Sequence, residues 1–208
     1  GPNDYVPDFA RAHVEVAQAA VTACRAAGVR RLLHMSALGA APDAPSEYLR
    51  SKGIGERAVL AAEDLEVTVF RPSVIFGPDD AFLNRFAGLA ALMPIIALPY
   101  PRARFQPVYV GDVVHAFRRA LDETGSIGRC YEVGGPTVYT LEELVRFVCV
   151  ATGRARPIVG LPDWFAYLQA WAMECLPVPP MTRDNCRSMQ VPSVCSGPPL
   201  PFGIAPTA

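Results

Sequence analysis

Tyr48 and Lys52 stand four residues apart in a segment, residues 47–62, whose pattern predicts a helix. Residues i and i+4 share a face of an α-helix, so the phenol and the ammonium group point the same way. A nearby cation favours phenolate over phenol and lowers the pKa of a tyrosine from its usual value of about 10. This arrangement suits a tyrosine that acts as a general acid or base on a hydroxyl or carbonyl group. The alternative interpretation is a surface contact without a catalytic role.

Lys52 is the only lysine of the 208 residues, because the other 18 of the 19 basic residues are arginines. With 20 acidic residues the net charge is −1, and the chain has no basic run. Affinity for nucleic acids comes mostly from neutralised phosphates, so this composition argues against a nucleic-acid partner. Hydrophobic residues make up 51% of the chain and charged residues 19%, which indicates a folded protein with a sizeable core.

Helix and strand patterns alternate along the first three quarters of the chain. Strands are predicted at residues 31–36, 67–70, 106–110 and 130–133. Helices are predicted at residues 9–27, 47–62 and 82–93, from an Asp112 cap to residue 121, and from a Thr140–Glu143 capping box to residue 152. This alternation predicts an α/β fold with a mostly parallel sheet, whose ligands lie beyond the carboxyl ends of the strands.

The composition changes near residue 160, since residues 161–208 contain nine prolines and only five charged residues. We therefore predict a domain over residues 1–160 and a small Pro-rich, mainly helical cap over residues 161–208. Residues 164–176 are expected to form an apolar helix, and the rest of the cap is expected to be extended. The cluster on that helix is expected to form the cap core, or alternatively to line a pocket for a hydrophobic or quinone-like substrate: Trp164, Phe165, Tyr167, Leu168 and Trp171.

Several stretches resemble a known family. A strand ending in Ser36 is followed by Tyr48-x-x-x-Lys52, by residues 71–73 (RPS) and by residues 77–78 (GP). This order resembles the extended, epimerase-like branch of the short-chain dehydrogenase/reductase superfamily. Four later stretches are more specific: residues 82–86 (FLNRF), 104–113 (RFQPVYVGDV), 131–136 (YEVGGP) and 182–185 (TRDN). They resemble the atypical group related to the accessory 1-alpha-subcomplex subunit nine of respiratory complex I, in a bacterial form.

The resemblance implies a Rossmann domain that binds NAD or NADP, with NADP(H) favoured, and an oxidoreductase or epimerase activity. It assigns Tyr48 as the acid/base, and Lys52 as the residue that binds the nicotinamide ribose and lowers the tyrosine pKa. Ser36 would contribute a catalytic hydroxyl that also contacts the cofactor. The backbone of Arg71, Pro72, Ser73 and Val74 would pass close to the nicotinamide.

The sequence departs from the family pattern at two places. No Gly-rich dinucleotide loop precedes any predicted helix, so we expect the C-terminal part of a doubly wound sheet without its pyrophosphate site. Extended reductases place the catalytic hydroxyl one position after Ser36, where this chain has Ala37. Ser36 either replaces that hydroxyl or only holds the end of the strand.

Two further functions remain open on the same residues. One is a nucleotide-binding accessory or assembly protein of a respiratory or quinone system, with little catalysis; the other is a sugar-nucleotide epimerase. We expect a cytoplasmic location, or peripheral contact with a complex of the inner membrane. The six cysteines have no metal-ligand spacing and are interpreted as reduced thiols, so no metal site is predicted. His34 is expected to be packed in its strand, and His13 and His115 to lie on helix surfaces.

Overall fold

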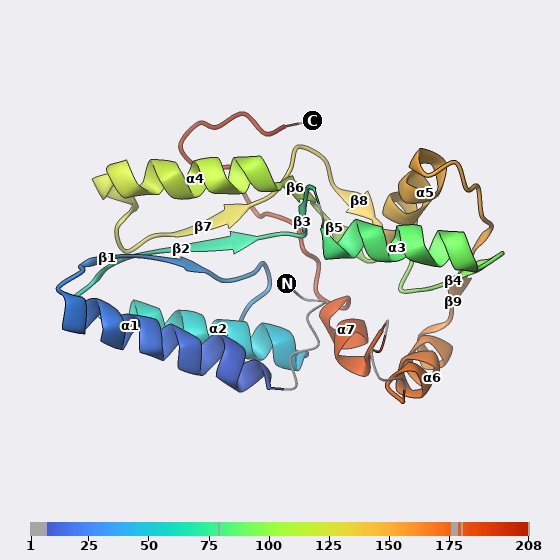
Figure 1. The fold of residues 1–208 in the computed structure, drawn as a ribbon, viewed down its shortest axis with the longest axis horizontal. Helices are drawn as coiled ribbons and strands as arrows, with labels where there is room; N and C mark the ends of the chain where they lie inside the picture. The colour runs from blue at the N-terminus through green and yellow to red at the C-terminus, as the bar shows by residue number, and fades with distance from the viewer. Residues whose placement is uncertain (1–7, 79, 176–178, 180, 208) are drawn as a thin grey trace.

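The computed structural model describes residues 8–78, 80–175, 179 and 181–207. Its main sheet consists of three parallel strands in the order β1 (Arg31–Met35), β2 (Glu66–Pro72) and β7 (Cys130–Val133). The helices α1 (Val16–Ala27) and α2 (Glu47–Leu60) cover one face of the sheet, and α4 (Val110–Asp122) covers the other (Figure 1). Helices on both faces confirm the predicted α/β class with a doubly wound, Rossmann-type parallel sheet.

The central strand β2 explains why the sheet needs helices on both sides. Four consecutive residues, 67–70, are buried, because their side chains point alternately toward the two helical layers. Val69 packs in the cluster formed with α1 and α2, which also contains Val21 and Val59. Phe70 faces the other layer, where its ring stacks on Phe117 of α4 with the ring centroids 4.3 Å apart.

The predicted helix boundaries agree with local capping chemistry. A π-helical turn, η1 (Arg11–Glu15), leads into α1, which ends at Gly28 with a φ of 69°. The backbone N–H of Leu49 donates to Ser46 Oγ over 3.1 Å, which begins α2. The capping box of Thr140 and Glu143 is present and begins α5 (Leu141–Ala151), as predicted.

A second group of elements lies beyond the carboxyl ends of the main strands. It contains α3 (Ala81–Leu92), α5 and three short strand pairs. The pairs are β3 (Ile75–Phe76) with β6 (Val108–Tyr109), β4 (Ile96–Pro99) with β9 (Ile158–Leu161), and β5 (Arg104–Phe105) with β8 (Tyr139–Thr140). The single strand predicted at residues 106–110 is therefore wrong, because pairing occurs in β5 and β6 on either side of Gln106 and Pro107, and α4 already begins at Val110.

The prediction that Asp112 caps α4 is also wrong. Tyr109 occupies the N-cap position, and Asp112 lies inside the first turn. The Asp112 carboxylate instead accepts hydrogen bonds from the backbone N–H and the hydroxyl of Thr207, over 2.7 and 2.8 Å. Asp112 therefore attaches the end of the chain to α4.

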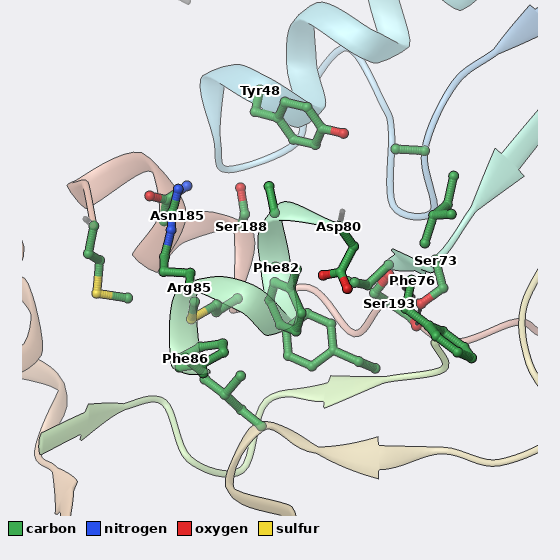
Figure 2. A pocket seen from close by; sticks show the side chains of 18 of the residues that line it. Tyr48, Ser73, Phe76, Asp80, Phe82, Arg85, Phe86, Asn185, Ser188 and Ser193 are labelled. Atoms are coloured by element: carbon green, nitrogen blue, oxygen red, sulfur yellow. Dashed lines mark hydrogen bonds between the residues drawn. The ribbon is translucent and has the colours of Figure 1, made fainter. Parts of the chain in front are cut away.

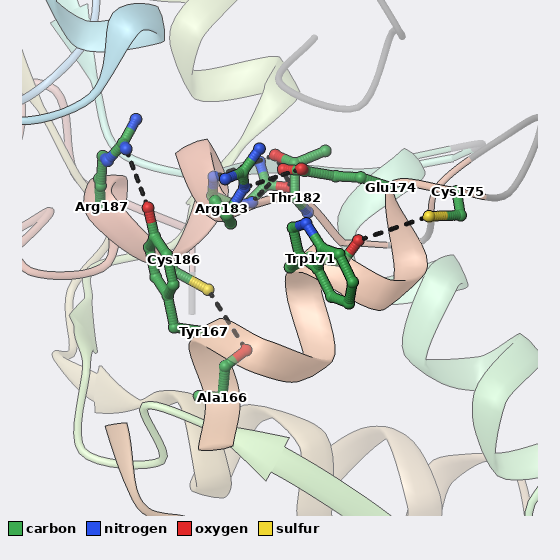
Figure 3. Close-up of polar contacts among 10 residues, drawn as sticks. Ala166, Tyr167, Trp171, Glu174, Cys175, Thr182, Arg183, Cys186 and Arg187 are labelled. Atoms are coloured by element: carbon green, nitrogen blue, oxygen red, sulfur yellow. Dashed lines mark hydrogen bonds and ion pairs between the residues drawn. The ribbon is translucent and has the colours of Figure 1, made fainter. Parts of the chain in front are cut away.

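The C-terminal region contains two helices, α6 (Asp163–Met173) and α7 (Arg183–Ser188). The sequence interpretation missed α7 and treated its residues as extended, although a Thr182–Asn185 capping box begins this helix. Figure 3 shows how the two helices are joined: Arg183 forms an ion pair with Glu174 over 2.8 Å, and Arg187 donates to the Tyr167 hydroxyl over 2.9 Å. The predicted C-terminal residue of the first helix, Leu176, lies outside the described residues.

The expected aromatic core of the cap is not formed. Trp164 and Trp171 are 69% and 53% exposed, and Phe165, Tyr167 and Leu168 are exposed as well. The inward face of α6 carries the small residues Ala166 and Ala170, both fully buried. Close packing on alanine turns the large side chains outward, so this cluster neither forms a core nor lines the cavity described below.

The last residues return to the sheet domain. The backbone of Ser193 bridges to that of Phe105, and Gly134 N–H donates to Pro199 O over 2.7 Å. Leu200 is buried in the same cluster as Phe70. The division at residue 160 stays a prediction, and residues 193–207 pack against the first 160 residues. No helix within the described ranges combines the length and the apolar character needed to cross a bilayer.

Candidate functional site

Tyr48 and Lys52 lie in the first turns of α2, beside the carboxyl end of β1. Lys52 Nζ donates a hydrogen bond to the backbone carbonyl of Met35 over 3.2 Å. This contact directs the ammonium group toward the end of the strand that continues into Ser36. The predicted spacing therefore brings the helix pair and the strand end together.

A cavity of about 510 Å³ opens at this point. Six of the seven predicted site residues line it: Ser36, Tyr48, Lys52, Pro72, Ser73 and Val74. Figure 2 shows Tyr48 on one side of the cavity, and Ser73 and Asp80 across from it on other elements. Residues from β1, α2 and β2 meet here because the carboxyl ends of parallel strands share one edge of the sheet.

Ser36 has the features expected of a ligand-binding hydroxyl. It is 2% exposed, and its Oγ has no hydrogen-bond partner among the described residues. Its backbone N–H donates to Phe70 O over 2.7 Å, which holds the residue at the strand end. A buried hydroxyl without a partner costs about 1–3 kcal/mol, which a ligand that reaches it would recover. The residues present therefore fit the nicotinamide and substrate end of a dinucleotide site.

Arg71 and Ser73 are held by protein contacts. The Arg71 guanidinium turns away from the cavity and forms an ion pair with Glu56, with Nε donating to Oε2 over 3.0 Å. Ser73 Oγ donates to Ser193 O over 2.7 Å and accepts from Gln106 N–H over 3.1 Å. The Ser73 side chain thus joins the C-terminal segment to β2, and its expected cofactor contact through the backbone stays a prediction.

The protonation of Tyr48 differs from the sequence expectation. Burial raises the pKa of Tyr48 to about 12, and burial also lowers the pKa of Lys52. The expected lowering of the tyrosine pKa by the lysine is therefore wrong for this structure, because loss of hydration penalises the phenolate. At neutral pH Tyr48 carries its proton and can donate it.

Two residues of the N-terminal helical region also belong to the site, and the sequence interpretation missed both. Phe9 and His13 pack on the Tyr48 ring, with ring centroids 6.0 and 5.4 Å away. Ser51 Oγ donates to Tyr48 O and lies 2.8 Å from His13 Nδ1, so Nδ1 carries the proton and donates to Ser51. His13 was expected on a helix surface; no local pattern indicates a contact across 35 residues.

Asp184 of α7 is the third residue that the sequence did not identify. Its carboxylate accepts hydrogen bonds from the backbone N–H groups of Glu47 and Tyr48, over 2.6 and 3.1 Å. These groups lie at the N-terminus of α2, where a negative charge is favourable. The TRDN stretch therefore connects the C-terminal region to the helix that carries Tyr48.

Residues 3–134 match the family described as "NAD dependent epimerase/dehydratase family". The chain belongs to this family. The resemblance to the epimerase-like branch of the short-chain dehydrogenases is thereby confirmed.

Similar proteins and solved structures agree with this family assignment. It is 31% identical to mitochondrial NADH dehydrogenase (ubiquinone) 1 alpha subcomplex subunit 9 of Mus musculus, over 90% of this chain and 50% of that protein. The chain thus spans about half the length of this curated relative. The solved structure of gox2253 has a TM-score of 0.66 at 25% identity, covering 90% of this chain and 64% of that one. A dTDP-glucose 4,6-dehydratase of Streptomyces venezuelae with NAD bound has a TM-score of 0.63 at 20% identity, covering 74% and 55%.

Replacing Asp184 with asparagine is expected to destabilise this epimerase/dehydratase family member by about 1 kcal/mol. The amide has one acceptor oxygen and no charge, so it serves the two N–H donors at the start of α2 less well. Urea unfolding measures the loss. Asp43→Asn, in the exposed loop before α2, is the control and should change stability by less than about 0.5 kcal/mol. Equal effects of the two substitutions would contradict the role of Asp184.

His34 should make the stability of this protein depend on pH. Burial first, and the charge of Lys52 second, lower the pKa of His34 from 6.5 to about 4. In the unfolded chain His34 therefore binds a proton near pH 6.5, whereas in the folded chain it binds this proton only near pH 4. The free energy of unfolding should fall as pH decreases through this window, by about 1–2 kcal/mol at pH 5 from His34. Denaturant unfolding at pH 7 and pH 5 measures it, and His34→Leu should reduce the dependence.

Proposed function

We propose that this protein is an NAD(P)-binding oxidoreductase or epimerase in which Tyr48 transfers a proton and Lys52 binds the nicotinamide ribose. The observation that carries the proposal is the convergence of Ser36, Tyr48 and Lys52 on one cavity, where the Ser36 hydroxyl is buried without a partner among the described residues. Membership of an NAD-dependent family supports a nicotinamide dinucleotide as the cofactor. NADP(H) is the form that we propose.

The chemistry follows from the protonation states. A bound nicotinamide dinucleotide supplies or accepts the hydride at the reacting carbon. In the reduction of a carbonyl, Tyr48 donates its phenolic proton to the substrate oxygen, and the Ser36 hydroxyl donates a hydrogen bond to the same oxygen. Lys52 would hold the ribose with its ammonium group, a compact charge with three donors. The backbone of residues 71–74 would border the nicotinamide.

Replacing Lys52 with methionine tests this proposal. The substitution keeps most of the side-chain volume and removes the ammonium group, so binding of the dinucleotide should weaken by about 10–30-fold, the value of a charged hydrogen bond. Fluorescence titration of the complete protein with NADPH and NADH measures the effect and decides between the two cofactors. A dissociation constant unchanged by the substitution contradicts the proposed role.

Arg57→Met provides the matched control on the same helix. Arg57 is exposed near the end of α2 and does not line the cavity. Its substitution removes the same unit charge, so a general loss of electrostatic attraction would appear in both variants. Only Lys52→Met should weaken dinucleotide binding.

A second candidate function is that of a nucleotide-bound accessory protein of a respiratory complex at the inner membrane. The similarity to a complex I subunit favours it, and so does Ala37 at the position of the usual catalytic hydroxyl. This function predicts a dinucleotide that does not exchange and comigration with the membrane NADH dehydrogenase on native gels. A rapidly exchanging dinucleotide with measurable turnover would contradict it.

A further inference from the structure

The cavity extends beyond Ser36, Tyr48 and Lys52, and the rest of its wall is mainly apolar. Its volume of about 510 Å³ lies in the range of about 300–1,000 Å³ that small-molecule sites occupy. Figure 2 shows Phe82 and Phe86 of α3 on the side opposite Tyr48. The apolar wall also includes Leu98 of β4, Phe105 of β5, Met173 of α6 and Met189. A ligand that extends from Tyr48 to α3 would bury apolar surface along this wall.

Few charges face this space. Among the described lining residues, the charged side chains are those of Lys52, Asp80 and Arg85. Lys52 is directed to the end of β1, as described above, which leaves Asp80 and Arg85 for the rest of the cavity. A nucleoside diphosphate carries two negative charges and is usually bound by several cations or free backbone N–H groups. A single arginine and a single aspartate along this wall are a poor match for that group.

The helix end in the cavity does not supply the missing attraction for phosphate. Asp80 and Ala81, at the N-terminus of α3, line the space, and a helix N-terminus attracts anions. Here the Asp80 carboxylate occupies that end, because Oδ1 accepts from Leu83 N–H over 2.6 Å. A phosphate would have to compete with a carboxylate already in place.

We propose that the substrate is a carbonyl or hydroxyl compound with a long apolar chain, whose reacting group lies at Tyr48 and whose chain lies along α3. This assignment rests on the proposed oxidoreductase function of the same site. Burial of each methylene group contributes about 0.8 kcal/mol, so the affinity should increase with the length of the chain along the apolar wall. The flexible side chains of Met173 and Met189 adapt to chains of different shape.

Gln169 of α6 adds a polar point to this wall. Its Oε1 is buried and has no hydrogen-bond partner within the described part of the chain. The residue lines the cavity from the same helix as Met173. A hydroxyl or N–H group on the substrate, at a distance from the reacting carbon, satisfies this acceptor. The substrate is thus mainly apolar and carries a donor along its length.

A chain-length series tests the proposal directly. Methyl ketones of about six to twelve carbons are titrated into the purified protein without dinucleotide, by isothermal titration calorimetry. The affinity should rise by about three- to fourfold for each added methylene until the wall is filled. UDP-glucose should not compete with the longest ketone. An affinity that is independent of chain length, or competition by UDP-glucose, would overturn the proposal, the latter in favour of a sugar nucleotide.

Two substitutions on α3 locate the chain. Leu89 lines the cavity, whereas Leu92, three residues further on, is 78% exposed and does not line it. Leu89→Gln should weaken binding of the longest ketone by about tenfold and leave the shortest nearly unchanged. Leu92→Gln should change neither. Equal behaviour of the two variants would contradict the placement of the chain along α3.

Failure of this inference can be distinguished from failure of the proposed function. Chain-length dependence together with an absence of NADPH and NADH binding supports the apolar ligand and overturns the oxidoreductase. Dinucleotide binding that Lys52→Met weakens, with no chain-length dependence, leaves the oxidoreductase in place and overturns the apolar substrate.

Discussion

Replacing Tyr48 with phenylalanine is expected to reduce turnover of the complete protein by about 10²–10⁴-fold, the contribution of a positioned general acid. The substitution removes one oxygen and preserves the ring that packs on Phe9 and His13. Binding of the dinucleotide should change little, because Lys52 makes the proposed ribose contact. The measurement is the rate of NAD(P)H oxidation with a long-chain ketone at saturating cofactor.

Tyr139→Phe is the matched control, since Tyr139 in β8 is 41% exposed and does not line the cavity. Unchanged turnover in Tyr48→Phe would remove the tyrosine from the mechanism. The pH profile adds a second readout. Since burial raises the pKa of Tyr48 to about 12, the phenol keeps its proton across the neutral range, and Tyr48 should cause no loss of ketone reduction between pH 7 and pH 9.

Local patterns predicted most of the elements in the first 160 residues. The spacing of apolar residues within a short segment indicates whether that segment is a strand or a helix, so these elements can be predicted locally. The β-branched and aromatic residues 67–70 of β2, the stop of α1 at Gly28 and the Thr140–Glu143 capping box are examples. The region around Gln106 and Pro107 was predicted less well, because β5 and β6 have only two residues each, too few to show a strand pattern of their own.

The candidate site likewise contains residues that the sequence predicted and residues that it did not. The predicted residues at the strand ends and on α2 meet at the cavity, because parallel topology brings strand ends together. Asp184 and His13 were not foreseen, since their contacts with α2 span 136 and 38 residues. The predicted direction of the Tyr48 pKa shift was wrong for a related reason. Burial by the whole fold outweighs the neighbouring lysine, and a local sequence pattern does not contain burial.

Gly55 lies in the interior of α2, and the sequence interpretation did not use this residue. Glycine in a helix interior costs about 1 kcal/mol relative to alanine, so its presence needs a reason in the packing. At Gly55 a Cβ atom would lie 2.1 Å from the backbone oxygen of His13. Backbone that close cannot rotate away as a side chain can, so α2 and η1 would have to separate.

Gly55→Ala should therefore destabilise the protein by about 2–3 kcal/mol, in spite of the better helix propensity of alanine. The midpoint of thermal unfolding should fall by about 5–10 °C. Gly88→Ala is the same substitution within α3, where nothing lies within 4 Å of the new Cβ. It should stabilise the protein by about 0.5–1 kcal/mol. If the two substitutions change the stability in opposite directions, backbone contact with the N-terminal helical region positions α2, and with it Tyr48 and Lys52. A gain in stability at both positions would contradict this contact.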